Sequence, residues 1–117
     1  MSVYNTHQRR DPFADIDAEE LARLRKFKCE ARGPHCVELG TQRHHGLVRC
    51  DNRRGKPFAK LLDVLINYQC VCHVCHTGTG YADSTENHDK FLELQRERYG
   101  ADVDLFFEML EAAGKVL

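Results

Sequence analysis

The spacing of four cysteines constrains this 117-residue chain more than any other feature. Cys72 and Cys75 form a C-x-x-C pair, and the wider pair of Cys29 and Cys36 encloses a Gly33-Pro34 turn. Zinc favours four thiolate or imidazole ligands in a tetrahedron, and two pairs of thiols can supply such a set. We therefore predict that Cys29, Cys36, Cys72 and Cys75 bind a structural Zn²⁺.

The sequence also allows other roles for its cysteines. Cys50 could replace Cys36 as the fourth ligand, and otherwise Cys50 and Cys70 are expected to be buried free thiols. The unit from Cys72 to His76 also has the spacing of a c-type haem attachment site. That role needs export and a second axial ligand, and it leaves the first cysteine pair unexplained. Disulfides are disfavoured in the reducing cytoplasm, where we expect the protein.

Length and composition predict a single soluble domain. Charged residues make up 30% of the chain, and no apolar run approaches the ~20 residues that a membrane span requires. The N-terminus lacks the apolar stretch of a secretory signal, which favours the cytoplasm. We expect a flexible lead-in over residues 1–14 and one domain over residues 15–117. A core of this size would gain materially from a structural metal.

Apolar periodicity and capping residues predict an α+β fold, with helices at both ends and short strands between them. Asp17 with Glu20 can cap a first helix over residues 18–28. Two short strands are expected around Gly46, within residues 41–50. After Pro57 a helix would bury Phe58, Leu61, Leu62 and Leu65. Two further helices, ended by glycines, are expected over residues 85–98 and 102–113.

Basic residues are concentrated just after the adjacent histidines His44 and His45. The net charge of −1 gives no overall reason to expect nucleic-acid binding. Residues 43–60, however, contain a single acid, Asp51, and these basic residues: Arg43, Arg49, Arg53, Arg54, Lys56 and Lys60. Such a strip suits the phosphate backbone of DNA, although an ordinary solvated loop can have the same composition.

The cysteines, histidines and one asparagine together carry a family resemblance. Their order is Cys…Cys…His-His…Asn…Cys-x-x-Cys-His, at Cys29, Cys36, His44, His45, Asn67, Cys72, Cys75 and His76. It resembles the zinc-stapled branch of the HNH (His-Me finger, ββα-metal) endonucleases, over somewhat less than half of the chain. The stretch from Asn67 to Cys75, with Arg98-Tyr99-Gly100 further on, is more weakly similar to phage recombination nucleases of the NinG type. The resemblance implies a phage or mobile-element origin and a bacterial host cell.

The resemblance implies a small ββα-metal core and a role for each matching residue. His44 and His76 would bind a catalytic divalent metal, Mg²⁺ or Mn²⁺, although two imidazoles could also accept Ni²⁺ or Zn²⁺. His45 would be the general base that deprotonates water. Asn67 would hold the loop and orient His45 by a hydrogen bond. The implied reaction is hydrolysis of a DNA phosphodiester, and a homodimer would suit double-strand cleavage.

Two departures from the family pattern affect the expected geometry. Many members carry a basic or histidine residue about one helical turn after the last histidine, and Gly80 stands there in this chain. With Gly78, it predicts a short finger helix or one that restarts near Ser84, from which His88 could supply the missing contact. The stretch between His45 and Asn67 is also long, and residues 58–65 would be an insertion.

The histidines also have structural interpretations. Adjacent residues on a strand point to opposite faces, so one of His44 and His45 could be structural unless the strand ends at Gly46. His7 and His35 are expected to be ordinary surface or core residues, and His73 is expected to be exposed. The alternative function is a non-catalytic zinc-binding module that binds nucleic acid or protein.

Overall fold

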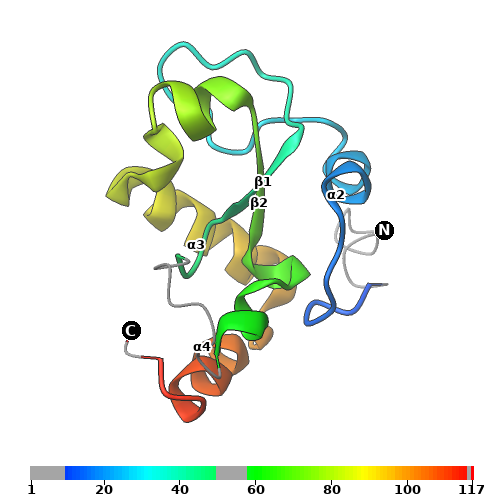
Figure 1. Ribbon diagram of the computed structural model, residues 1–117, viewed down its shortest axis with the longest axis vertical. Coiled ribbons are helices and arrows are strands. Elements are labelled where there is room, and N and C mark those ends of the chain that lie inside the picture. The colour runs from blue at the N-terminus through cyan, green and yellow to red at the C-terminus, as the bar shows by residue number, and fades with distance from the viewer. Residues whose placement is uncertain (1–9, 50–57, 116) are drawn as a thin grey trace.

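A two-stranded antiparallel hairpin lies at the centre of the computed structural model, which describes residues 10–49, 58–115 and 117 (Figure 1). Strand β1 (Gln42–His45) pairs with strand β2 (Tyr68–Val71), and the register places His45 opposite Tyr68. The sequence predicted two strands around Gly46. The first of these strands is confirmed as β1, but the second is wrong for the described residues, because the partner of β1 is β2, which lies beyond a long connection.

Strand β2 escaped prediction because both of its faces are buried. Tyr68 and Cys70 pack in a cluster with helix α2 (Ala18–Leu24), while Gln69 and Val71 point to the opposite face. Figure 1 shows α2 on one side of the hairpin and helix α3 on the other. A strand covered on both faces does not show the alternation of polar and apolar residues that marks a half-buried strand.

Helix α2 begins as predicted and ends earlier than predicted. The Asp17 carboxylate accepts a hydrogen bond from the Glu20 N–H at 2.8 Å, which caps the helix. The helix was expected to continue to residue 28, but it ends at Leu24. Lys26 and Phe27 take left-handed φ values of 59° and 56°, which turn the chain away from the helix axis towards the first cysteine pair.

Helices α3 (Thr85–Tyr99) and α4 (Asp102–Ala112) confirm the predicted C-terminal half. The Ser84 hydroxyl accepts from an N–H of the first turn of α3, and Gly100, at φ 57°, ends that helix. On α4, Val103, Phe106 and Leu110 are buried at helical spacing. The predicted terminal helix therefore packs against the core of its own chain.

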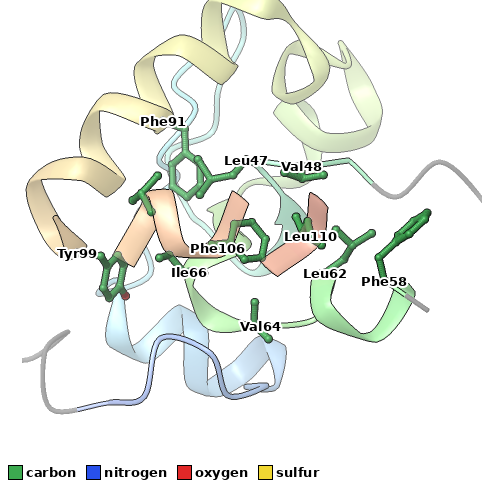
Figure 2. Close-up of a cluster of buried hydrophobic side chains, with 11 residues drawn as sticks. Leu47, Val48, Phe58, Leu62, Val64, Ile66, Phe91, Tyr99, Phe106 and Leu110 are labelled. Atoms are coloured by element: carbon green, nitrogen blue, oxygen red, sulfur yellow. The ribbon is translucent and has the colours of Figure 1, made fainter. Parts of the chain in front are cut away.

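The largest apolar cluster joins α3 and α4 to the connection between the strands. Figure 2 shows Phe106 and Leu110 in the middle of this cluster, with Phe91 and Phe58 towards its two sides. Its buried members are Leu47, Val48, Phe58, Leu62, Val64, Ile66, Phe91, Tyr99, Val103, Phe106 and Leu110. The cluster includes Leu47 and Val48, which follow β1, and three residues that precede β2: Leu62, Val64 and Ile66.

The connection contains two short turns in place of the predicted helix after Pro57, which itself lies outside the described residues. These are η1 (Ala59–Leu62) and η2 (Leu65–Asn67). Asp63 and Val64 separate them because Val64 is extended, with φ −136° and ψ 153°. The predicted core positions are confirmed: Phe58, Leu62 and Leu65 are buried, and Leu61 packs against the cluster.

Part of the predicted N-terminal lead-in belongs to the folded structure. The carbonyl groups of Pro12 and Ala14 accept hydrogen bonds from the N–H groups of Ile66 and Leu65, both at 2.8 Å. Residues 12–14 are thus joined to η2, whereas residues 1–9, including His7, lie outside the described structure. Within the described ranges, no helix is long and apolar enough to cross a membrane.

A buried ion cluster joins α2 and α3 to the segment that carries Cys29. The Glu30 carboxylate lies between the guanidinium groups of Arg25 and Arg98 and accepts a hydrogen bond from the Cys70 N–H at 2.8 Å. Burial alone would raise the pKa of Glu30, but the two guanidinium groups and this N–H outweigh it and hold the pKa below its ordinary value.

Candidate functional site

The four predicted zinc ligands come together at one end of the hairpin. The Sγ atoms of Cys29, Cys36, Cys72 and Cys75 all lie within 4.8 Å of one another. In Figure 1 the loop that carries the first pair (cyan) passes beside the turn after β2 (yellow-green) at the top of the view. The predicted grouping of the two cysteine pairs is confirmed as a cluster that could hold a metal ion. Cys50 lies outside the described residues.

Backbone N–H groups donate hydrogen bonds to sulfur atoms of this cluster. The Cys75 N–H donates to Cys72 Sγ at 3.4 Å, and the Glu38 N–H donates to Cys36 Sγ at 3.2 Å. Burial would raise the pKa of Cys72, but the N–H groups of Cys75 and Val37 and the neighbouring thiols lower it to about 6. Because thiolate is the metal-binding form, this environment favours the state of Cys72 that a cation needs, whereas burial raises the pKa of the Cys36 and Cys75 thiols.

Cys70 lies outside the cysteine cluster and is a buried free thiol, as predicted. Burial, together with the nearby Glu30 carboxylate, raises the pKa of its thiol to about 12. The thiol therefore stays protonated at neutral pH and behaves as a small apolar side chain.

The three motif histidines line a single open pocket of about 370 Å³ beside the hairpin. His44 and His45 end β1, and His76 lies in the turn η3 (Val74–Gly78), which follows the C-x-x-C pair. Among the described residues, its lining is Arg43, His44, His45, Arg49, Asp63, Tyr68, His76 and Asp83. β1 ends at His45, directly before Gly46, and both adjacent histidines line this pocket.

The two predicted metal ligands, His44 and His76, lie next to each other with one ring nitrogen of each already bonded. Their ring centroids are 5.4 Å apart. Nε2 of His44 lies 3.0 Å from the Ala82 carbonyl oxygen, and Nδ1 of His76 lies 2.7 Å from Gln42 Oε1. Since an oxygen acceptor takes up one nitrogen of each ring, the lone pair of the other nitrogen is available to a ligand.

The electrostatic environment keeps His44 neutral. Burial lowers the pKa of its imidazole, and the nearby His76 adds to this effect, while the Asp83 carboxylate at 3.8 Å works in the opposite direction. A neutral imidazole is the form that binds a metal.

His45 is held on two sides at the mouth of the pocket. Its Nε2 atom lies 2.9 Å from Asp63 Oδ1, and its ring stacks on Tyr68 with centroids 5.8 Å apart. The next residue must be glycine, because a Cβ at Gly46 would approach the ring of Phe91 to 2.5 Å.

Asn67 holds the loop after His45 by four hydrogen bonds to the backbone, and none of these four involves the His45 ring. Its Oδ1 accepts from the N–H groups of Leu47 and Val48, and its Nδ2 donates to the carbonyls of Val48 and Leu62. These bonds, at 2.8–3.0 Å, use both donors and both acceptor positions of the amide. The implied hydrogen bond from Asn67 to His45 is therefore wrong, and any effect on His45 passes through the loop.

The predicted nucleic-acid contacts lie partly within the described residues. Arg43 and Arg49 line the pocket, and Arg49 is largely exposed, with its Nε 3.6 Å from Asp83 Oδ1. Arg53, Arg54 and Lys56 lie outside the described residues.

The described histidines without a motif role, His35, His73 and His88, do not line this pocket. His73 is exposed, as predicted, and His35 is also exposed. His88 does not supply the contact suggested for it, because its Nε2 bonds to the Leu47 carbonyl at 3.0 Å. The chain after His76 follows the predicted break at Gly78 and Gly80, and α3 restarts at Thr85.

Comparison of the chain with models of known protein families, with curated proteins and with solved structures found no match.

Two pocket carboxylates, Asp63 and Asp83, were not predicted as site residues. Asp63 lies in the expected insertion and Asp83 lies beyond the glycines, so neither has a fixed spacing from the histidines that could have revealed it.

Proposed function

We propose that this protein is a metal-dependent endonuclease that hydrolyses phosphodiester bonds of DNA, with a structural Zn²⁺ on the four-cysteine cluster. One observation supports this proposal most. A single pocket collects His44, His45 and His76, and an oxygen acceptor holds one ring nitrogen of each. A zinc-binding module without catalytic activity has no need of that arrangement.

The His44 and His76 side chains would hold the catalytic cation. With metal–nitrogen bonds of about 2.1 Å, two ligating imidazoles have their centroids roughly 5 to 6 Å apart, and the separation here is 5.4 Å. Asp83 adds a carboxylate to the same pocket, and carboxylate oxygen is a ligand type that suits Mg²⁺ and Mn²⁺. When bound, such a cation would supply Lewis-acid stabilisation of the charge on the departing 3′ oxygen.

The remaining groups of the pocket would bind the substrate and move a proton. His45 would accept the proton of the attacking water, a role that suits a partly exposed imidazole at the pocket mouth. Arg49, with its side chain 68% exposed, and Arg43 would bind the DNA phosphates, which are contacts independent of base sequence. The products would carry a 5′-phosphate and a 3′-hydroxyl.

A plasmid-nicking assay tests the proposal. Purified protein with its zinc content measured is incubated with supercoiled, nicked and branched DNA in Mg²⁺, Mn²⁺ or Ni²⁺, with and without EDTA. We expect metal-dependent cleavage that His45→Ala abolishes while zinc content and thermal stability stay unchanged. His73→Ala is the matched control, because His73 is exposed and does not line the pocket, and it should cleave like the wild type.

Inactivity of the wild-type protein on every substrate and metal would contradict the nuclease proposal. If the inactive protein still bound DNA or a protein partner in a zinc-dependent way, the non-catalytic module would be the better description. Full activity of His45→Ala would contradict the assignment of the general base.

A further inference from the structure

The connection between β1 and β2 places the carboxylate of Asp63 beside His45, the proposed general base. Asp63 follows the turn η1 and lies 2.9 Å, through Oδ1, from Nε2 of His45. Asp63 lies eighteen positions after His45 in the sequence. Asp63 therefore reaches His45 only because the segment of residues 58–65 folds back over the end of β1.

Asn67 joins the two chain segments that carry this pair. Its amide bonds to Leu47 and Val48, just after His45, and to the carbonyl of Leu62, the residue before Asp63. All four bonds are buried. The separation between His45 and Asp63 is thus set by a rigid, fully bonded amide rather than by two independent loops.

The contact determines which ring nitrogen of His45 is able to accept a proton. A carboxylate offers only acceptor positions, so the hydrogen of the contact must be on Nε2 of the neutral imidazole. The lone pair is then on Nδ1. Tyr68 stacks on the ring at 5.8 Å between centroids, which limits rotation of the ring out of this orientation.

We propose that Asp63 is a positioning residue for His45. Its carboxylate accepts the Nε2 hydrogen, so that Nδ1 keeps the lone pair that takes the proton from water. This inference rests on the proposed nuclease function for its catalytic meaning, and on the His45–Asp63 geometry for its structural content. It gives the segment of residues 58–65, which the family resemblance left as an insertion, a role in the site.

The tautomer of His45 tests the inference without any activity measurement. Long-range ¹H–¹⁵N spectra of zinc-loaded protein labelled at histidine are recorded at pH 8, where an ordinary imidazole is neutral. Signals of His45 are assigned by their loss in His45→Ala. We expect the Nε2–H tautomer in the wild type and in Asp63→Asn, whose amide oxygen still accepts, and a mixture of tautomers in Asp63→Ala. An Nδ1–H tautomer in the wild type, or an unchanged tautomer in Asp63→Ala, would overturn the inference.

Kinetics of plasmid nicking give the second test. Asp63→Ala should lower kcat roughly 10- to 100-fold, the scale on which outer hydrogen-bond partners act, with KM and Mn²⁺ affinity unchanged. Asp63→Asn should recover part of this loss, and Glu108→Ala, which removes an exposed carboxylate on α4, should have no effect. A change in KM or in Mn²⁺ affinity in place of kcat would assign Asp63 to substrate or metal binding and overturn the inference. If the wild type does not cleave DNA, the proposed function fails, and the tautomer spectra still decide the His45–Asp63 contact.

Discussion

Replacing Asn67 by alanine should destabilise the protein strongly, because this side chain ties together two segments of the core. The Asn67 side chain is fully buried and makes four hydrogen bonds to the backbone. A typical hydrogen bond contributes a net 0.5–1.5 kcal/mol or so to stability, so the four together are worth about 4 kcal/mol. That is a large share of the roughly 5–15 kcal/mol that stabilises a small domain. Asn67→Ala should lower the free energy of unfolding by about this amount.

Urea denaturation at constant free Zn²⁺ measures the effect, and Gln95→Ala is the matched control. Gln95 is also fully buried, but with the described residues its side chain makes two hydrogen bonds, one donated to the Ile66 carbonyl at 2.7 Å and one accepted from Arg98 at 3.0 Å. Because the Gln95 side chain is longer, its truncation leaves a larger cavity than truncation of Asn67. This cavity term alone would make Gln95→Ala the more destabilising of the two variants. We expect Asn67→Ala to cost about 2 kcal/mol more than Gln95→Ala. Equal or smaller destabilisation by Asn67→Ala would refute the conclusion that this amide ties the loop after β1 to η1.

Three other predictions concern the metal cluster, the buried ion cluster and the end of β1. Cys36→Ser should lose bound zinc and lower the melting temperature, whereas Cys70→Ser should keep its zinc, as measured by metal analysis of both purified variants. The pKa of Glu30 is held below its ordinary value, so its contribution to stability is present above the unfolded-state pKa and is lost as pH falls through the folded-state pKa. The difference in unfolding free energy between wild type and Glu30→Gln should accordingly be constant near neutral pH and shrink below about pH 4.3, and a difference independent of pH would contradict this. Gly46→Ala should cost about 1–3 kcal/mol through the clash with Phe91, measured by urea denaturation, and wild-type stability in this variant would contradict the close approach.

Local rules were sufficient where a segment depends mainly on its own residues. The caps at Asp17 and Ser84, the break at Gly100 and the buried stripe of α4 were predicted from spacing, because hydrogen bonds and periodicity within a few residues determine them. The four-cysteine cluster was predicted for a similar reason. Thiol pairs at short spacing are pre-arranged as half of a tetrahedral site, wherever the rest of the chain runs.

Local rules failed where long-range contacts decide the backbone. The strand β2 is covered on both faces, so it lacks the alternation of polar and apolar residues by which a half-buried strand is recognised. The helix after Ala18 was cut short because the chain must turn at Lys26 and Phe27 to bring Cys29 into the cysteine cluster. The turns before Asn67 replace a helix that apolar spacing alone favoured.

The sequence by itself determined which side chains could do chemistry, and the tertiary structure decided which of them meet. The types and order of the cysteines, His44, His45 and His76 already predicted two metal-binding groups. Only the fold placed the three histidines in one pocket and brought Asp63 to His45. It also decided that the hydrogen bonds of the Asn67 amide go to the backbone of the connection between the strands. The physical reason is that ligand and acid–base types are properties of single residues, whereas their distances depend on the burial of both faces of β2 and on the bonds that Asn67 makes across the chain.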